Sequence, residues 1–311
     1  MIPLPAALQA AAARAYRRSR DRLQGSFFRL AAGGAVPARW FAPPPPAARA
    51  ARSGVLHVEI VSHCWRYSRL LACQLRSLQQ HPPRDVRVTM TVVHAREDAE
   101  TVALLEATRA IAVPNVCWRW MALPPAELFR RAIGRNRAGR ATAADWVWFT
   151  DCDVVFGPGC LDGLARALQG CDAVLVHPRE ELGTPILDAD DLGGVHDGRA
   201  LADPVAMDCT PRRLTRATGP MQIVHGDVAR ARGYCADVPL YQRPAARWRK
   251  AHEDRAFRWL LRTPGLGVTV PAVYRVRHAH KGRDAGRRSP LRAMLRRWRT
   301  RRQDRAGTAR A

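Results

Sequence analysis

Residues 146–156 read WVWFTDCDVVF, and this stretch decides the fold. Its first four residues are large and apolar, which predicts a strand that is buried on both faces. Asp151 and Asp153 follow at once. Since residues i and i+2 of an extended segment point the same way, both carboxylates face one side. The stretch therefore predicts a buried strand that ends in a pair of acids.

The segments around this strand alternate between two patterns. Apolar, β-branched runs predict further strands at 55–61, 86–93, 115–120 and 173–176, and helical spacing predicts helices at 66–80, 100–110, 125–142 and 159–169. This order predicts an α/β fold with a mostly parallel, Rossmann-like sheet flanked by helices. Ligands of such sheets collect at the carboxyl ends of the strands, where the two acids lie. Residues 178–218 show little periodicity and are expected to form a long loop that is either functional or mobile.

The charge of the chain is concentrated at its two ends. The 311 residues carry 51 Lys+Arg against 27 Asp+Glu, a formal net charge of +24. Residues 1–52 contribute +8 and residues 281–311 contribute +10. We expect a basic, Pro-rich N-terminal extension (1–53), a catalytic domain (54–282) and a basic amphipathic tail (283–311). Arginine can bind phosphate with its forked guanidinium, although a chain-wide bias toward Arg and Ala also explains the total.

Several classes of protein are excluded by the composition. A hydrophobic fraction of 47% excludes a disordered chain, and no apolar run of about 18 residues indicates a transmembrane helix. The eight cysteines form no C-x-x-C pair, so we interpret them as small buried hydrophobes in a reducing compartment. The N-terminus does not have the pattern of a secretory signal, because its arginines follow the alanine-rich segment. A cytoplasmic location is therefore expected.

Asp151 and Asp153 are candidate metal ligands. Two adjacent carboxylates repel each other unless a cation lies between them, and oxygen ligands suit Mg²⁺ or Mn²⁺. His278 and His280 follow an apolar segment at 268–276, and alternation places both on one face. Either histidine could complete the metal site as neutral imidazole. The alternatives are a solvated turn for the acids and a surface or structural role for the histidines.

Two further groups of polar residues carry candidate chemistry. Glu253-Asp254 opens the helical run HEDRAFRWLL, where a carboxylate could take a proton from an attacking hydroxyl. The alternative is a pair of acids that stabilises the first turn of a helix. Arg135-Asn136 lies on the helix before the acidic strand and could reach a phosphate or nucleotide, the alternative being a solvated basic face.

Taken in order, these motifs resemble the glycosyltransferase A-type fold, and most of all family 2 glycosyltransferases. The first strand and helix, VEIVSHCWRYSRLLACQLRSL, are similar to the start of those proteins. Gly134–Asn136 resembles their A-R-N segment, Asp151 and Asp153 match their D-x-D motif, and Glu253-Asp254 matches a later E-D pair. The segment GPMQIVHGDVARARGY, at 219–234, resembles their sugar- and acceptor-facing segment. The similarity extends over residues 55–282.

The resemblance implies an inverting transfer from a nucleotide-sugar donor to a hydroxyl acceptor, with Mn²⁺ or Mg²⁺ on the diphosphate. It implies Asp254 as the base, with Glu253 beside it. It assigns the nucleotide to Ser62, Arg135 and Asn136, and the sugar or acceptor to Gln222 and His225.

Two departures from the family pattern stand out. HAREDA follows the second strand where D-D-x-S is common, which leaves the nucleoside contacts open. The absence of Q-x-x-R-W argues against processive polymer synthesis.

Two other classes of function are weighed against this one. A nucleotidyltransferase usually carries a Gly-rich, basic loop after the first strand, and residues 62–66 read SHCWR instead. A nucleic-acid-binding protein would use the +24 charge, but that charge lies mainly on the two ends, so no nucleic acid is expected as a partner.

The basic ends indicate a peripheral location on the inner face of the plasma membrane. Residues 289–299 predict a basic amphipathic helix, which suits an anionic surface. A lipid-linked or envelope glycan is then the expected acceptor. The alternatives are a helix that docks on its own domain and a frayed tail.

Overall fold

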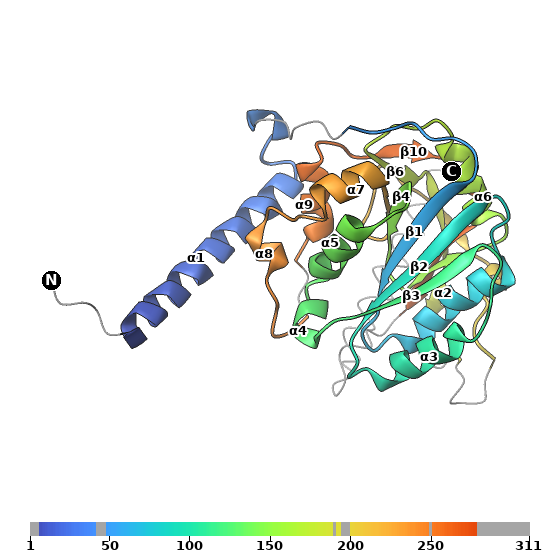
Figure 1. Cartoon of the computed structure of the whole chain (residues 1–311), viewed down its shortest axis with the longest axis horizontal. Helices are drawn as coiled ribbons and strands as arrows, with labels where there is room; N and C mark the ends of the chain where they lie inside the picture. The colour runs from blue at the N-terminus through green and yellow to red at the C-terminus, as the bar shows by residue number, and fades with distance from the viewer. Residues whose placement is uncertain (1–5, 42–47, 189–190, 194–199, 249–250, 279–311) are drawn as a thin grey trace.

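The computed structural model describes residues 6–41, 48–188, 191–193, 200–248 and 251–278 (Figure 1). Seven strands form the central sheet, in the order β10-β6-β9-β4-β1-β2-β3. Their bounds are β1 Leu56–His63, β2 Val86–His94, β3 Val116–Ala122, β4 Trp146–Phe149, β6 Leu175–Pro178, β9 Gln222–His225 and β10 Leu266–Val268. The fold is thus α/β, and β9 is antiparallel to both of its neighbours, β4 and β6.

Helices cover both faces of this sheet. On one side lie α2 Ser68–Gln80, α3 Ala99–Arg109 and α6 Cys160–Leu168. On the other lie α4 Pro125–Leu128, α5 Arg131–Ala141, α7 Gly226–Arg232, α8 Pro239–Gln242 and α9 Glu253–Leu260. Trp146 and Trp148 pack into the hydrophobic core under α2, α3 and α6, whereas Val147 and Phe149 pack into the core on the opposite face of the sheet. β4 is therefore buried on both faces, as its run of large apolar residues predicts.

The predicted alternation of strands and helices is confirmed from β1 to β6, with one break. The helix expected over 125–142 is divided into α4 and α5. Arg130 lies between them with φ −110° and ψ 85°, outside the helical region.

The expectation of a long irregular loop at 178–218 is wrong over part of its length. β7 Glu180–Leu187 and β8 Thr210–Arg213 pair with each other, and a 3₁₀ turn forms at Pro204–Ala206. With β5 Val154–Phe156 and β11 Val273–His278 they build a second sheet, in the order β5-β11-β7-β8. The single strand expected at 268–276 is likewise two strands, β10 and β11, which belong to different sheets. Short strands with mixed polarity, such as β8, give little periodic signal.

The N-terminal extension contains a long helix, α1 Ala6–Ala32. The end of α1 that leads into the rest of the chain packs on α8 and α9, while its other end extends away from the body (Figure 1). A 3₁₀ turn follows at Ala38–Trp40. Arg52 pairs with Asp145 and with Asp227, so the chain is already docked on the body just before β1. The predicted C-terminal tail lies outside the described residues.

Candidate active site

The acidic pair lies where the central strand β4 ends, and backbone bonds fix its loop. Thr150 N donates to Val61 O at 2.9 Å, which continues the pairing of β4 with β1. The amide of Gln74, on α2, donates to Asp151 O at 3.1 Å and to Val154 O at 2.8 Å. Val276 N, on β11, donates to Asp153 O at 2.8 Å. The loop is therefore tied to both sheets and to a helix, which restricts where the two carboxylates can point.

Asp151 is held by two arginines of α5. Arg131 Nη1 donates to Asp151 Oδ1 at 2.8 Å, and Arg135 Nη2 donates to the same oxygen at 3.1 Å. Arg135 is fully buried, while the side chains of Asp151 and Arg131 are 23% and 21% exposed. Burial would raise the pKa of Asp151, but the guanidiniums of Arg131 and Arg135 outweigh it and hold the pKa well below its usual range. Asp151 is therefore an ionised carboxylate.

Arg131 connects this acid to the second acidic motif. Its Nε donates to Glu253 Oε1 at 3.3 Å, and Glu253 is the first residue of α9. The side chain of Glu253 is only 4% exposed. One guanidinium thus bridges the end of β4 and the start of α9, two segments about one hundred residues apart in the chain.

A second chain of hydrogen bonds, buried except at its last bond, joins the same two motifs. Arg135 Nη1 donates to the Tyr234 hydroxyl at 2.9 Å, and that hydroxyl donates to Gln222 Oε1 at 2.8 Å. Gln222 Nε2 then donates to Asp254 O at 2.8 Å. Three hydrogen bonds in series thus link α5, β9 and α9, although Arg135 Nε is buried without a partner among the described residues.

Asp254 lies in the first turn of α9, next to Gly219. A Cβ atom placed on Gly219 would lie 3.4 Å from Asp254 Oδ2. The residue before the helix, His252, has the positive φ of 57° that turns the chain into α9. Asp254 is partly exposed, in contrast to the buried Glu253 beside it. Of the two acids, Asp254 is the one that an incoming hydroxyl could reach.

Asp153 has a different set of neighbours. Arg275, on β11, lies 2.7 Å from Asp153 Oδ2, and His278 Nε2 lies 4.0 Å from the same oxygen. Burial raises the pKa of Asp153 to about 6, against the opposing effect of Arg275 and with a further contribution from Asp151. Asp153 Oδ1 is buried and has no hydrogen-bond partner among the described residues.

This geometry is a test of the predicted metal ligands. Asp153 and His278 are the predicted ligands that could take part in holding a divalent cation: Asp153 Oδ1 has no partner among the described residues, and His278 Nε2 lies 4.0 Å from the other oxygen, Oδ2, which also meets Arg275. Mg²⁺-type ions take one or two protein carboxylates plus waters and phosphates. Asp151 fits less well, because one of its oxygens already accepts from two arginines. His280 lies outside the described residues. Within the described ranges, no group of three or more His, Cys, Asp and Glu side chains is arranged to hold a metal ion.

Three other predicted residues lie elsewhere or have structural partners. Asn136 donates to Gln242 Oε1 at 3.1 Å and accepts from Tyr234 N at 3.0 Å, so it braces the loop after α7. Ser62, near the carboxyl end of β1, is fully buried, and its Oγ has no partner within the described part of the chain.

His225 does not join the site. β9 is antiparallel to β4, so Gln222 pairs with Phe149 near the acids while His225 pairs with Trp146 at the opposite end. There the His225 ring caps α7 through Asp227 N. The family resemblance assigns Gln222 and His225 to the same sugar- or acceptor-facing segment. Because β9 is antiparallel to β4, only the Gln222 end of that segment lies near the acids.

The structure adds Arg131, Tyr234 and Arg275 to the candidate site. Arg131 is one helical turn before Arg135, so the i, i+4 rule could have placed both on one face. Arg275 was harder to find, because strict alternation puts it opposite His278. The pairing of β11 with β7 shifts register between Arg275 and Arg277, which breaks the alternation and lets both Arg275 and His278 approach Asp153.

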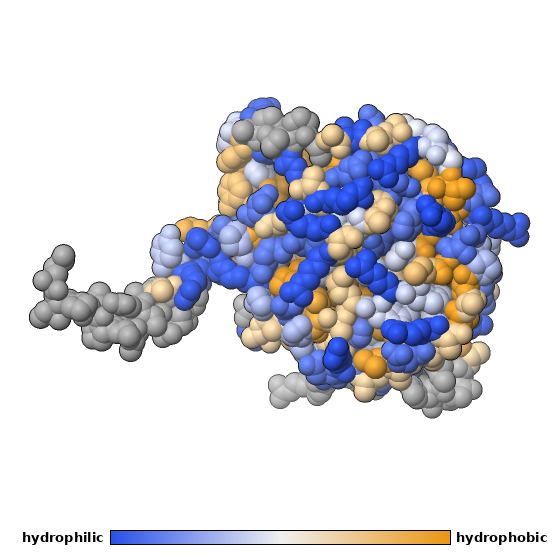
Figure 2. All heavy atoms as spheres, in the orientation of Figure 1, coloured by the Kyte–Doolittle hydropathy of each residue, from blue (hydrophilic) through white to orange (hydrophobic). Residues whose placement is uncertain are grey.

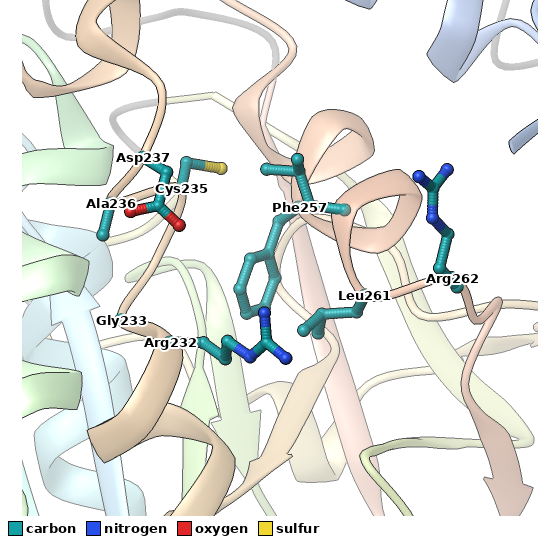
Figure 3. Close-up of a pocket in the computed structure, with 9 residues that line it drawn as sticks. Arg232, Gly233, Cys235, Ala236, Asp237, Phe257, Leu261 and Arg262 are labelled. Atoms are coloured by element: carbon teal, nitrogen blue, oxygen red, sulfur yellow. The ribbon is translucent and has the colours of Figure 1, made fainter. Parts of the chain in front are cut away.

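A cavity of about 180 Å³ lies beside the C-terminal half of α9 (Figure 3). Phe257 and Leu260 line it from α9, Arg232 lines it from the end of α7, and Cys235 and Asp237 line it from the segment after α7. None of the residues predicted for the active site lines this cavity. It is therefore separate from the acids at the end of β4.

No family model and no curated protein matches this chain. Among solved structures, a mannosyltransferase from Pyrobaculum calidifontis in complex with GDP-Man and Mn²⁺ is similar at 16% identity and a TM-score of 0.45, over 97% of this chain and 75% of that one. S. aureus TarS 1–349 in complex with UDP is similar at 11% identity and a TM-score of 0.43, over 71% of this chain. The chain spans 60% of that TarS fragment.

Proposed function

We propose that this chain is an inverting glycosyltransferase, similar to family 2, that moves a sugar from a nucleotide-sugar donor to a hydroxyl acceptor. The observation that carries the proposal is the bridge that Arg131 makes between Asp151 and Glu253. It brings the acidic pair after β4 and the acidic pair that opens α9 to one place, at the carboxyl end of a parallel strand. Glycosyl transfer requires these two functions side by side: a site for the leaving diphosphate and a base for the acceptor.

In this proposal Asp254 takes the proton from the acceptor hydroxyl as the oxygen attacks the anomeric carbon. Attack on the face opposite the diphosphate inverts that carbon. Arg131 positions α9, through Glu253, so that Asp254 faces the donor. The partly buried hydrogen bond from Gln222 to Asp254 O fixes the same turn of the helix.

Asp153 and His278 would hold a divalent cation, Mn²⁺ or Mg²⁺, which neutralises charge on the leaving diphosphate when it is bound. Arg131 and Arg135 keep the neighbouring Asp151 ionised, because they lower its pKa. For Ser62 and Asn136 only the family resemblance supports a nucleotide contact, since Ser62 is fully buried and Asn136 is bonded to Gln242 and Tyr234. Among the described residues, no helix combines the length and apolarity needed to cross a bilayer. We further propose a cytoplasmic enzyme at the inner face of the plasma membrane, with a lipid-linked or envelope glycan as acceptor.

The proposal is tested by thermal-shift screening of UDP-, GDP- and dTDP-sugars with and without Mn²⁺, followed by turnover assays with the donor that stabilises the chain. Asp254→Asn should lower turnover by about 10²- to 10⁴-fold, the usual contribution of a general base, while donor affinity stays within about twofold. Asp237→Asn is the matched control, since Asp237 is an exposed acid on the cavity beside α9. Equal turnover in Asp254→Asn and the control, or no stabilisation by any nucleotide sugar, contradicts the proposal.

A further inference from the structure

The helix α1 packs on α8 and α9 at one end and projects away from the body at the other (Figure 1). Its last turns are anchored: Phe28 and Ala31 are buried, and the ring of Phe27 lies 5.5 Å from that of Trp259 on α9. The rest of the helix leaves the body (Figures 1 and 2). At a rise of about 1.5 Å per residue, its 27 residues span about 40 Å. In the middle of the helix the side chains of residues 13, 15–17, 19, 20, 22 and 23 are exposed.

That surface carries a stripe of large apolar side chains. Tyr16 is 69% exposed, Leu23 is 71% exposed and Leu30 is 55% exposed. They are seven residues apart, and an α-helix drifts by only about 20° per seven residues, so the three share one face. Three aligned exposed hydrophobic residues on a single helix differ from the singly scattered apolar residues of an ordinary surface.

Basic residues accompany this stripe. α1 contains six arginines and one acid, Asp21, and that acid is paired with Arg243 of the body. Arg17, Arg20 and Arg22 are exposed in the middle of the helix. Past its end Trp40 is 68% exposed, and tryptophan favours the boundary between lipid and water.

The net charge of α1 decides which of two partners could cover the stripe, a second copy of the chain or a lipid surface. A second copy of the chain would bring another helix of net +5 against the first, with one acid per helix to offset the repulsion. An anionic lipid surface attracts the arginines and accepts the apolar side chains between them. We infer that α1 is a membrane-binding helix, whose stripe of Tyr16, Leu23 and Leu30 enters the headgroup region of an anionic bilayer. This inference deepens the proposed location but does not depend on the proposed transferase activity.

The test is co-sedimentation of the full chain with vesicles of phosphatidylcholine, alone or with 30% phosphatidylglycerol. We expect binding to the anionic vesicles that is at least tenfold stronger than to the neutral ones and is weakened by 0.5 M NaCl. Tyr16→Glu combined with Leu23→Glu should reduce binding at least tenfold. Ile111→Glu is the matched control, because Ile111 is a 44% exposed apolar residue on the body, and it should bind as the parent does.

The charge is tested separately with a second pair of variants. Arg17→Gln combined with Arg20→Gln should weaken binding to anionic vesicles several-fold. The control, Arg84→Gln with Arg87→Gln, removes the same charge from exposed positions on the body and should have little effect. Light scattering in the absence of lipid measures whether a second copy of the chain covers the stripe instead. A dimer that Leu23→Glu dissociates overturns the inference. Equal binding by the α1 variants and their controls, with circular dichroism unchanged, also overturns it.

Discussion

Replacing Arg131 with alanine removes the guanidinium that lies between Asp151 and Glu253. The side chains of the three residues are 21%, 23% and 4% exposed, so the cluster is neither a surface pair nor a fully buried one. Breaking a buried pair costs about 3–5 kcal/mol, and an exposed pair contributes about 0–1 kcal/mol. We expect Arg131→Ala to lower the free energy of unfolding by about 2–3 kcal/mol, since Asp151 keeps Arg135 while Glu253 loses the cation that bridges it to Asp151.

Urea denaturation followed by circular dichroism measures this change, and Arg137→Ala is its control. Arg137, on the same helix, pairs with Glu127, and its side chain is 49% exposed. Its loss should cost no more than about 1 kcal/mol. A double-mutant cycle adds Glu253→Gln: this change should be costly in the parent and nearly neutral after Arg131→Ala, because the charge it removes is then unpaired. Equal costs in the two backgrounds would refute the bridge.

The difference in unfolding free energy between the parent and Arg131→Ala should depend on pH. The pKa of Asp151 is lowered in the folded state, so its ionisation stabilises the fold at pH values above the unfolded pKa of about 4. That contribution is lost as the pH falls toward the folded pKa. The difference in stability between the parent and Arg131→Ala should therefore narrow below pH 4, and a constant difference would contradict the assignment.

Three shorter predictions follow from single contacts. Gly134→Ala should destabilise the fold by about 1–3 kcal/mol in urea titrations, because the new Cβ would lie 2.5 Å from His63 Nε2. Gly25→Ala in α1 is its control: the nearest atom to the new Cβ would be 3.6 Å away, so the change should be neutral or stabilising. Asp153→Asn should gain stability relative to the parent as the pH rises from 4 to 7, because the parent must ionise a buried carboxyl whose pKa is raised to about 6; parallel pH profiles would exclude that shift. EDTA should reduce the thermal shift given by the best nucleotide sugar, His278→Ala should have the same effect, and a shift insensitive to both would remove the metal from the proposal.

The sheet could be predicted from the sequence because its signals are local. β4 is a continuous apolar run, and β1 and β2 are rich in β-branched apolar residues, so these strands need no distant partner to be recognised. The position of Asp151 followed directly, since an acid after a buried strand must lie at the carboxyl edge of the sheet. The second sheet lacked such signals: β8 is TPRR, four exposed residues without alternation, and only its pairing with β7 defines it as a strand.

The partners of the acids depend on tertiary contacts, and this is where sequence reasoning stopped. Local logic correctly stated that Asp151 and Asp153 repel each other unless a cation is near. From the sequence alone, that cation is expected to be a metal ion. In the structure the nearby positive charges are the guanidiniums of Arg131 and Arg135 from α5 and of Arg275 from β11. The two acids thereby become unequal: the pKa of Asp151 is lowered and that of Asp153 is raised. A site whose carboxylates differ in this way can keep one acid for organising the protein and leave the other, with its unpartnered oxygen, for a ligand.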